Sequence, residues 1–229
     1  MEIYLTSNLF IKDNQYYYED EGESVSKGSV SKGSETRIVK LNRQNWHKYM
    51  IEYEYEKLSL GWKKRLKSKL SKNSLWGIKD CGGEGDCLFL CIEEAMRDFQ
   101  KMEDESYSVE NLRKIAAAEI TDVNFNIILE TYKAEAECDE FDGMWDPYTI
   151  RNKEELKEVI ETCGNTFWGD HIIIQLLSQA LNINFIILND ENELALQEFR
   201  LQRVGIDFQQ HRKTIILSYY SNVHYQLIG

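Results

Sequence analysis

The stretch Gly82-Gly83-Glu84-Gly85-Asp86-Cys87-Leu88-Phe89 predicts a turn that delivers a cysteine to the start of a helix. Beyond the cysteine, apolar residues follow at Phe89, Ile92, Met96 and Phe99. This spacing is typical of one face of an amphipathic helix. Free backbone N–H groups and the helix macrodipole favour an anion at that end of a helix. We therefore expect the pKa of Cys87 to be lowered and its thiolate to be reactive.

The glycines before Cys87 have a second use. Backbone without side chains can approach a substrate carbonyl closely, and its N–H groups can then stabilise an oxyanion. The turn is not a phosphate-binding P-loop, because it lacks the Gly-Lys-Ser/Thr ending of that motif. A small core cysteine that follows an ordinary turn is the alternative interpretation of this stretch taken alone.

Two distant motifs favour catalysis. They are Trp168-Gly169-Asp170, which precedes a helical pattern, and Asn222-Val223-His224-Tyr225 in a strand-like segment. A cysteine with a histidine far away in sequence is the usual pattern of a cysteine protease. In this order the three motifs resemble the ovarian tumour (OTU) family of deubiquitinating cysteine proteases. The resemblance covers roughly residues 76–229.

The resemblance implies a thiol-dependent deubiquitinase that hydrolyses isopeptide bonds at the C-terminal glycine of ubiquitin. It makes Cys87 the nucleophile, which forms a thioester, and His224 the base. It assigns the oxyanion hole to the backbone N–H groups of Glu84, Gly85 and Cys87. It assigns substrate contacts to Trp168, Gly169 and Tyr225. The implied partners are ubiquitin or polyubiquitin chains, and no cofactor or metal is needed.

The sequence departs from the family pattern at two positions. The residue three before the cysteine is usually Asp, and here it is Glu84. The residue two after the histidine is usually Asp or Asn, and here it is Gln226. Strand alternation puts both Gln226 and Asn222 on the face of His224, so either amide can orient the ring. We expect Gln226 in this role, and His171 is the rival base.

Two other functions use the same sequence features. One is a protease for another ubiquitin-like modifier, which needs the same cysteine and histidine. The other is a non-catalytic ubiquitin-binding scaffold, which replaced catalytic residues would indicate. Cys87 and His224 are both present, which favours an enzyme. The spacing of Cys81, Cys87 and Cys91 does not match a structural zinc site.

Composition and charge restrict the cellular setting. The chain has 229 residues, of which 42% are hydrophobic and 29% charged, as in a soluble globular protein. We see no apolar run of membrane-spanning length and no signal peptide. The odd number of five cysteines suggests a reducing compartment, so we expect the protein in the cytoplasm. For a viral protein, this expectation becomes the host cell cytoplasm or the virion. Scarce proline with abundant Asn, Lys, Ile and Tyr suggests an AT-rich genome, such as that of a large DNA virus.

The net charge of −12 bears on the partner. Acidic bulk argues against nucleic acid and suits a partner with a basic surface or tail. Ubiquitin ends in a basic, glycine-rich tail, which fits this expectation. We expect the protein to act as a monomer.

The expected organisation is an N-terminal extension over residues 1–40 and an OTU-like catalytic domain over residues 41–229. The extension has a possible strand or hairpin within 1–18 and a linker-like stretch at 19–36, where Val-Ser-Lys-Gly-Ser occurs twice. Apolar spacing predicts helices over 43–72, with an interruption at Gly61, and over 109–119, 123–137, 153–163 and 170–181. Apolar runs predict strands at 185–188, 194–204, 214–220 and 223–228. The fold class is therefore α/β (α+β), and the resemblance implies a papain-like fold with a mostly antiparallel sheet of about five strands between helices.

Overall fold

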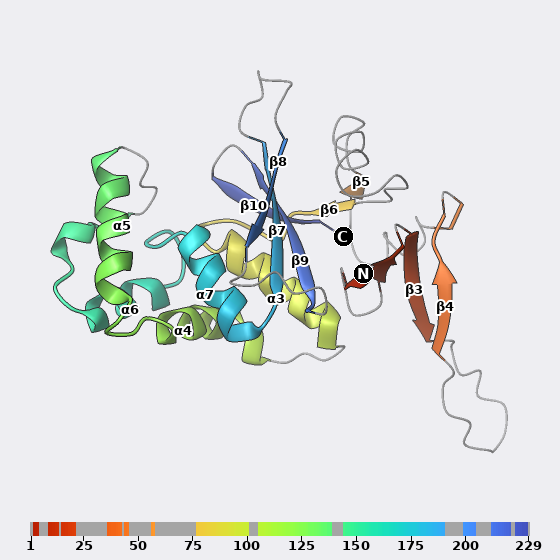
Figure 1. The fold of residues 1–229 in the computed structure, drawn as a ribbon, viewed down its shortest axis with the longest axis horizontal. Helices are drawn as coiled ribbons and strands as arrows, with labels where there is room; N and C mark the ends of the chain where they lie inside the picture. The colour runs from red at the N-terminus through yellow and green to blue at the C-terminus, as the bar shows by residue number, and fades with distance from the viewer. Residues whose placement is uncertain are drawn as a thin grey trace, which may run out of the picture.

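A computed structural model describes residues 2–4, 9–13, 15–21, 36–42, 44–45, 56–57, 77–100, 105–138, 144–190, 199–204, 212–220 and 223–228. These parts form a mixed α/β fold, as the sequence predicts, with two β-sheets and five α-helices (Figure 1). The larger sheet lies at the centre, most helices gather at one end, and β3 and β4 lie at the other end.

The larger sheet has six strands rather than about five. Their order is β5 (Glu56–Lys57), β6 (Gly77–Lys79), β10 (His224–Ile228), β9 (Thr214–Tyr220), β7 (Asn184–Asp190) and β8 (Phe199–Val204). Neighbouring strands are antiparallel except β7 and β9, which are parallel. The mostly antiparallel sheet that was expected is confirmed, and β10 lies inside it between β6 and β9.

The smaller sheet is built from the N-terminal residues. Its strands follow in chain order as β1 (Glu2–Tyr4), β2 (Leu9–Lys12), β3 (Gln15–Glu21) and β4 (Thr36–Lys40), and all pairs are antiparallel. Tyr16, Tyr18 and Leu41 are buried in the same apolar core as the central sheet. Both β3 and β4 reach into the stretch expected to be a linker, and residues 22–35 lie outside the described part of the chain.

Five helices occupy most of the predicted helical segments. They are α3 (Cys87–Gln100), α4 (Val109–Ala118), α5 (Phe125–Glu137), α6 (Lys153–Glu161) and α7 (His171–Leu181). Two short 3₁₀ helices, η1 (Glu105–Tyr107) and η2 (Pro147–Thr149), lie between them. Caps explain two of the helix starts: the Ser108 side chain accepts from the Asn111 N–H, and the Asp170 carboxylate accepts from the N–H groups of Ile172 and Ile173.

The helix expected over 43–72 is wrong where the structure describes that stretch. Glu56 and Lys57 form β5, which pairs with β6 at the edge of the central sheet. Backbone pairing with an available strand overrides the helical spacing at these two residues. Residues 46–55 and 58–76 lie outside the described part of the chain.

The core lies between the central sheet and the helices that contact it. Helix α3 contacts β10 and β9, and α7 contacts β7 and β8. The apolar runs of β7 and β9 are buried, as expected for strands inside a covered sheet. Helix α4 packs against α3, α6 and α7. Among the described helices, none has the length and apolarity needed to cross a bilayer.

Candidate active site

The glycine-rich turn before α3 has an unusual backbone. Gly82, Glu84 and Gly85 have φ values of +120°, +57° and +89°, in the region that favours glycine. Gly85 also contacts the neighbouring backbone closely. A Cβ at this position would overlap the carbonyl oxygen of Gly164 and lie 2.9 Å from the Cα of Asn165. Glycine at position 85 is therefore required by both conformation and space.

Cys87 is the first residue of α3, as predicted, but its thiol is more buried than expected. Its exposed fraction is 8%. Burial raises the pKa of the Cys87 thiol above its usual value, and the nearby backbone N–H groups of Tyr225 and Leu88 offset this only in part. The expected lowering of this pKa is therefore wrong, because loss of solvation outweighs the favourable field of the helix N-terminus.

His224 begins β10, and a carboxylate holds its ring. His224 Nε2 lies 3.1 Å from Asp80 Oδ1, and the same oxygen accepts a hydrogen bond of 3.0 Å from the Gly82 N–H. The other ring nitrogen, Nδ1, is left for chemistry. Cys87 lies near the same end of β10: the backbone N–H of Tyr225 is close enough to the Cys87 thiol to lower its pKa through a hydrogen bond.

Strand pairing explains how Asp80 reaches the histidine. Strand β6 pairs with β10, with Lys79 opposite Leu227. Asp80 follows one step further along this register, beside Gln226. Alternate residues of a strand face the same side, so Gln226 and His224 share a face and Asp80 lies within diagonal reach of the ring.

The side chain found at the His224 ring is Asp80 and not the Gln226 amide expected there. Among the described residues, the Gln226 side chain makes no hydrogen bond, and the His224 ring contacts Asp80 instead. Asn222 lies outside the described part of the chain. A carboxylate just beyond the end of the neighbouring strand is better suited to the role than a neutral amide, because it stabilises the imidazolium form of the ring.

The N–H groups expected to form the oxyanion hole are available. Within the described residues, those of Glu84 and Gly85 donate to no backbone or side-chain acceptor, and that of Cys87 is directed at its own thiol. The Glu84 side chain is exposed and makes no hydrogen bond or ion pair with another described residue. The change from Asp to Glu at this position therefore leaves its backbone contribution intact.

The Trp168-Gly169-Asp170 motif packs against the cysteine helix. A Cβ on Gly169 would lie 2.5 Å from Leu88 Cδ2, so only glycine lets this segment approach residue 88. Asp170 caps α7, and burial raises the pKa of its carboxyl group. These contacts account for two positions of the motif by packing and capping. Substrate contact by Trp168 and Gly169 stays a prediction.

The expected substrate contact by Tyr225 does not fit the structure. Its side chain is 5% exposed and stacks on Tyr219 with ring centroids 4.4 Å apart. The alternation of β10 explains this, because Tyr225 points to the side opposite His224. The Tyr225 ring is thus part of the core.

The other cysteines and the rival histidine do not form a comparable array. Cys91 is fully buried, its Sγ lies 3.6 Å from the carbonyl oxygen of Tyr225, and burial raises its pKa well above the usual value. His171 is exposed, and its Nε2 lies 3.9 Å from Glu135. Among the described residues, His224 is therefore the histidine that a carboxylate holds beside the cysteine turn.

Sequence reasoning missed Arg113, which contacts the turn from α4. Its side chain is fully buried and pairs with Asp86 at 2.6 Å. A signal was present, because Arg113 falls within the apolar stripe formed by Leu112, Ala116 and Ala117. A charged residue inside such a stripe must find a buried partner.

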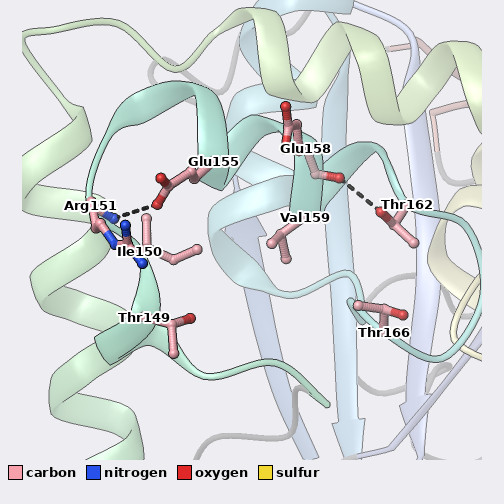
Figure 2. Close-up of a pocket in the computed structure, with 8 residues that line it drawn as sticks. All are labelled: Thr149, Ile150, Arg151, Glu155, Glu158, Val159, Thr162 and Thr166. Atoms are coloured by element: carbon pink, nitrogen blue, oxygen red, sulfur yellow. Dashed lines mark hydrogen bonds between the residues drawn. The ribbon is translucent and has the colours of Figure 1, made fainter.

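A separate pocket of about 460 Å³ lies between η2, α6 and the segment after α6. Figure 2 shows its lining residues: Thr149, Ile150, Arg151, Glu155, Glu158, Val159, Thr162 and Thr166. Two of its walls are fixed by hydrogen bonds, from the Arg151 N–H to Glu155 and from the Thr162 hydroxyl to the Glu158 carbonyl. None of the candidate catalytic residues lines this pocket.

The cysteine turn, the Trp-Gly-Asp motif and most of β10 fall within the match to one protein family. The profile of the family described as OTU-like cysteine protease matches residues 82–227, which extend from the glycine turn into β10. The chain therefore belongs to the OTU-like cysteine protease family.

Solved structures similar to this chain are also OTU domains. The OTUD1 OTU domain has a TM-score of 0.47 and 14% identity, over 82% of this chain and 99% of that one. The viral OTU protease of Dera Ghazi Khan virus has a TM-score of 0.43 and 13% identity, over 67% and 80%. An OTU deubiquitinase of Wolbachia pipientis wMel bound to ubiquitin has a TM-score of 0.44 and 10% identity, over 67% of this chain and 95% of that one. A search of curated proteins finds no match.

Proposed function

We propose that this protein is a deubiquitinase that uses Cys87 as nucleophile, His224 as general base and Asp80 as the orienting carboxylate. The observation that carries the proposal is the contact between His224 and Asp80 beside the cysteine turn, in a chain of the OTU-like cysteine protease family. A nucleophile, a base and a third group that orients the base are the general signature of covalent catalysis.

The first half of the reaction forms a thioester. Because burial raises the pKa of Cys87, the resting thiol is neutral at pH 7, and its proton moves to His224 Nδ1 as sulfur attacks the glycine carbonyl. The carbonyl oxygen becomes an oxyanion that accepts hydrogen bonds from the N–H groups of Glu84, Gly85 and Cys87. When the C–N bond breaks, His224 returns the proton to the leaving lysine amine.

The second half consumes one water. His224 removes a proton from the water, the hydroxide attacks the thioester carbonyl, and the same N–H groups stabilise the second oxyanion. Collapse breaks the C–S bond and releases the C-terminal carboxylic acid of ubiquitin, which loses its proton to solvent, while His224 returns the proton taken from water to the Cys87 thiolate. Asp80 stabilises the imidazolium in both halves, because its Oδ1 lies 3.1 Å from Nε2.

Ubiquitin as the substrate is supported by family membership and by charge. The net charge of −12 suits a partner with a basic tail, and ubiquitin ends in such a tail. Ubiquitin chains are accordingly the proposed partners, and the cytoplasm, of a virus-infected host if the source is viral, is the proposed compartment. Free thiols, such as the five cysteines of this chain, suit that compartment.

The test is labelling with ubiquitin that carries a C-terminal electrophile, followed by mass mapping of the modified residue. We expect one adduct, on Cys87, no adduct in Cys87→Ala, and full labelling of the control Cys163→Ala, which removes an exposed thiol. Parallel probes built on ubiquitin-like modifiers test the alternative substrates. Binding of ubiquitin without any adduct would identify a non-catalytic scaffold and overturn the proposal.

A further inference from the structure

A buried arginine contacts the cysteine turn. Arg113, on α4, has no exposed surface, and its guanidinium lies over the ring of Phe89, 4.3 Å from the centroid. Its Nε and Nη2 donate to Asp86 Oδ1 at 2.9 and 2.6 Å. A buried charge without partners is very unfavourable, so this pairing is a strong constraint on where Asp86 can lie.

The other donors of Arg113 reach the segment that faces the turn. Nη1 donates to the carbonyl of Ile160 at 2.9 Å, and Nη2 donates to the carbonyls of Phe167 at 3.0 Å and Gly85 at 3.4 Å. One guanidinium therefore connects the turn, the last residues of α6 and the residue before Trp168. This fork of fixed donors is a geometry that lysine cannot reproduce.

Asp86 completes the connection from its other oxygen. Its Oδ2 accepts a hydrogen bond of 2.8 Å from the Gly164 N–H, and the Gly164 carbonyl lies against Gly85. Asp86 thus binds α4 through one oxygen and the 160–167 segment through the other. Both contacts occur at the residue immediately before the candidate nucleophile.

We propose that Arg113 and Asp86 are positioning residues that hold the N–H groups of Glu84, Gly85 and Cys87 in the geometry of an oxyanion hole. The inference rests on the proposed function. The positive φ of Glu84 is unfavourable for a residue with a side chain and persists only where surrounding contacts determine it. The Arg113–Asp86 pair supplies these contacts, so weakening it lets the turn relax and moves the donors away from the developing oxyanion.

Asp86→Asn is the most informative variant, because it keeps the shape of the side chain and removes its charge. On a fluorogenic ubiquitin C-terminal amide we expect kcat to fall by about 100-fold, the usual effect of losing an oxyanion donor, with KM within about threefold. Alkylation of Cys87 by iodoacetamide creates no oxyanion, so its rate should stay within about twofold of wild type. Arg113→Lys should show the same pattern, because it keeps the charge and loses the fork.

The matched control is Asp122→Asn, which breaks the exposed ion pair of 2.7 Å with Lys153. It should change neither kcat nor the alkylation rate. Near-UV circular dichroism restricts the comparison to folded protein. A parallel loss of amide hydrolysis and alkylation in Asp86→Asn and Arg113→Lys would show a general disruption and overturn the inference, and so would unchanged kcat in both.

Hydrogen exchange separates this inference from the proposed function, because it needs no substrate. We expect the two hydrogen-bonded amides at this contact, those of residue 86 and Gly164, to exchange about tenfold faster in Asp86→Asn than in Asp122→Asn, while those of β9 stay unchanged. Should wild-type protein fail to cleave any ubiquitin substrate, the proposed function falls and exchange alone decides the positioning role. Equal exchange in both variants would overturn that role.

Discussion

Asp80 Oδ1 lies 3.1 Å from His224 Nε2 and 3.0 Å from the Gly82 amide nitrogen, so one carboxylate oxygen joins the candidate base to the glycine turn. Asp80 directly follows β6 and His224 begins β10, and the pairing of these two strands brings the residues together. Loss of this carboxylate should therefore disturb both the ring orientation and the start of the turn.

Asp80→Ala should lower kcat roughly 10–100-fold, less than the ~10⁴ seen when a buried triad carboxylate is lost, because Asp80 is 59% exposed. Asp80→Asn keeps an acceptor for the Gly82 N–H, so its kcat should fall less than that of Asp80→Ala. The matched control is Gln226→Ala, on the same face of the sheet, which should stay within about twofold of wild type. Steady-state kinetics on a ubiquitin amide measure kcat for each variant. A lower kcat in Gln226→Ala than in Asp80→Ala would show that Gln226 orients the His224 ring.

The raised pKa of Cys87 predicts an alkaline shift in its reactivity. In a His224→Ala background, alkylation of Cys87 should rise at a higher pH than alkylation of the same cysteine in urea-denatured protein. Asp80→Asn in that background should move the profile to lower pH, because the Asp80 charge contributes to the raised pKa. Rates are measured by mass spectrometry of the Cys87 peptide. Coincident native and denatured profiles would contradict the effect of burial.

The same shift has a consequence for stability. The neutral thiol favours the folded state below the unfolded pKa of about 8.5, and this contribution is lost as pH rises through the higher folded pKa. The difference in unfolding free energy between wild type and Cys87→Ala should therefore move against wild type above about pH 8.5. Urea titrations at several pH values measure it. A difference that is independent of pH would show that the thiol is solvated.

Gly85→Ala should be strongly damaging. The added Cβ would overlap the Gly164 carbonyl, and alanine disfavours the φ of +89°. We expect a loss of at least ~3 kcal/mol of unfolding free energy, together with most activity. The control is Gly83→Ala in the same turn, because a Cβ there meets nothing within 4 Å. It should cost no more than ~0.5 kcal/mol, and equal losses for the two variants would be inconsistent with the structure.

Glu84→Gly should stabilise the protein and leave activity within about twofold, because the residue supplies only a backbone N–H. Its φ of +57° is unfavourable for a residue with a side chain, and glycine removes this strain. Glycine also makes the unfolded chain more flexible, so the net gain in unfolding free energy should be about 0.5–1 kcal/mol. Glu84→Gln keeps the side chain and the strain, and should match wild type in both measurements. A large loss of kcat in Glu84→Gln would instead assign a role to the carboxylate.

The repeat-containing segment should be replaceable without loss of activity. Glu21 and Thr36 are directly paired at the ends of β3 and β4. Replacing residues 22–35 by Asn-Gly, the favoured two-residue hairpin turn, should keep kcat/KM within about twofold and the melting temperature unchanged or higher. Deletion of residues 19–36, by contrast, removes paired residues of β3 and should destabilise the protein. Poor activity of the Asn-Gly variant would place the segment in the substrate site.

The helices and buried strands could be predicted because their signals are local. Apolar spacing indicated α3 to α7, and uninterrupted apolar runs indicated β7 and β9. The position of Cys87 followed from the same spacing. These features depend on residues within a few positions of one another.

The contacts that complete the candidate site depend on register between distant strands. Strand β6 has only three residues, Gly77–Lys79, which is too short for a periodic signal. Without β6 no local signal brings Asp80 to His224, whereas Gln226 lies two residues after the histidine, at the spacing of the family pattern. Burial was missed for the same reason, since α3 and β10 must pack together before Cys87 loses its solvent.

The position of β10 between β6 and β9 has a consequence for folding order. β9 precedes β10 directly and can pair with it as a hairpin, whereas β6 must wait for a partner that lies far along the chain. Until β10 is inserted, the facing edges of β6 and β9 are unpaired, and His224 is not yet beside Asp80. Catalytic competence should thus appear in the last cooperative step of folding, so that partly folded chains carry a cysteine without the power to cleave anything.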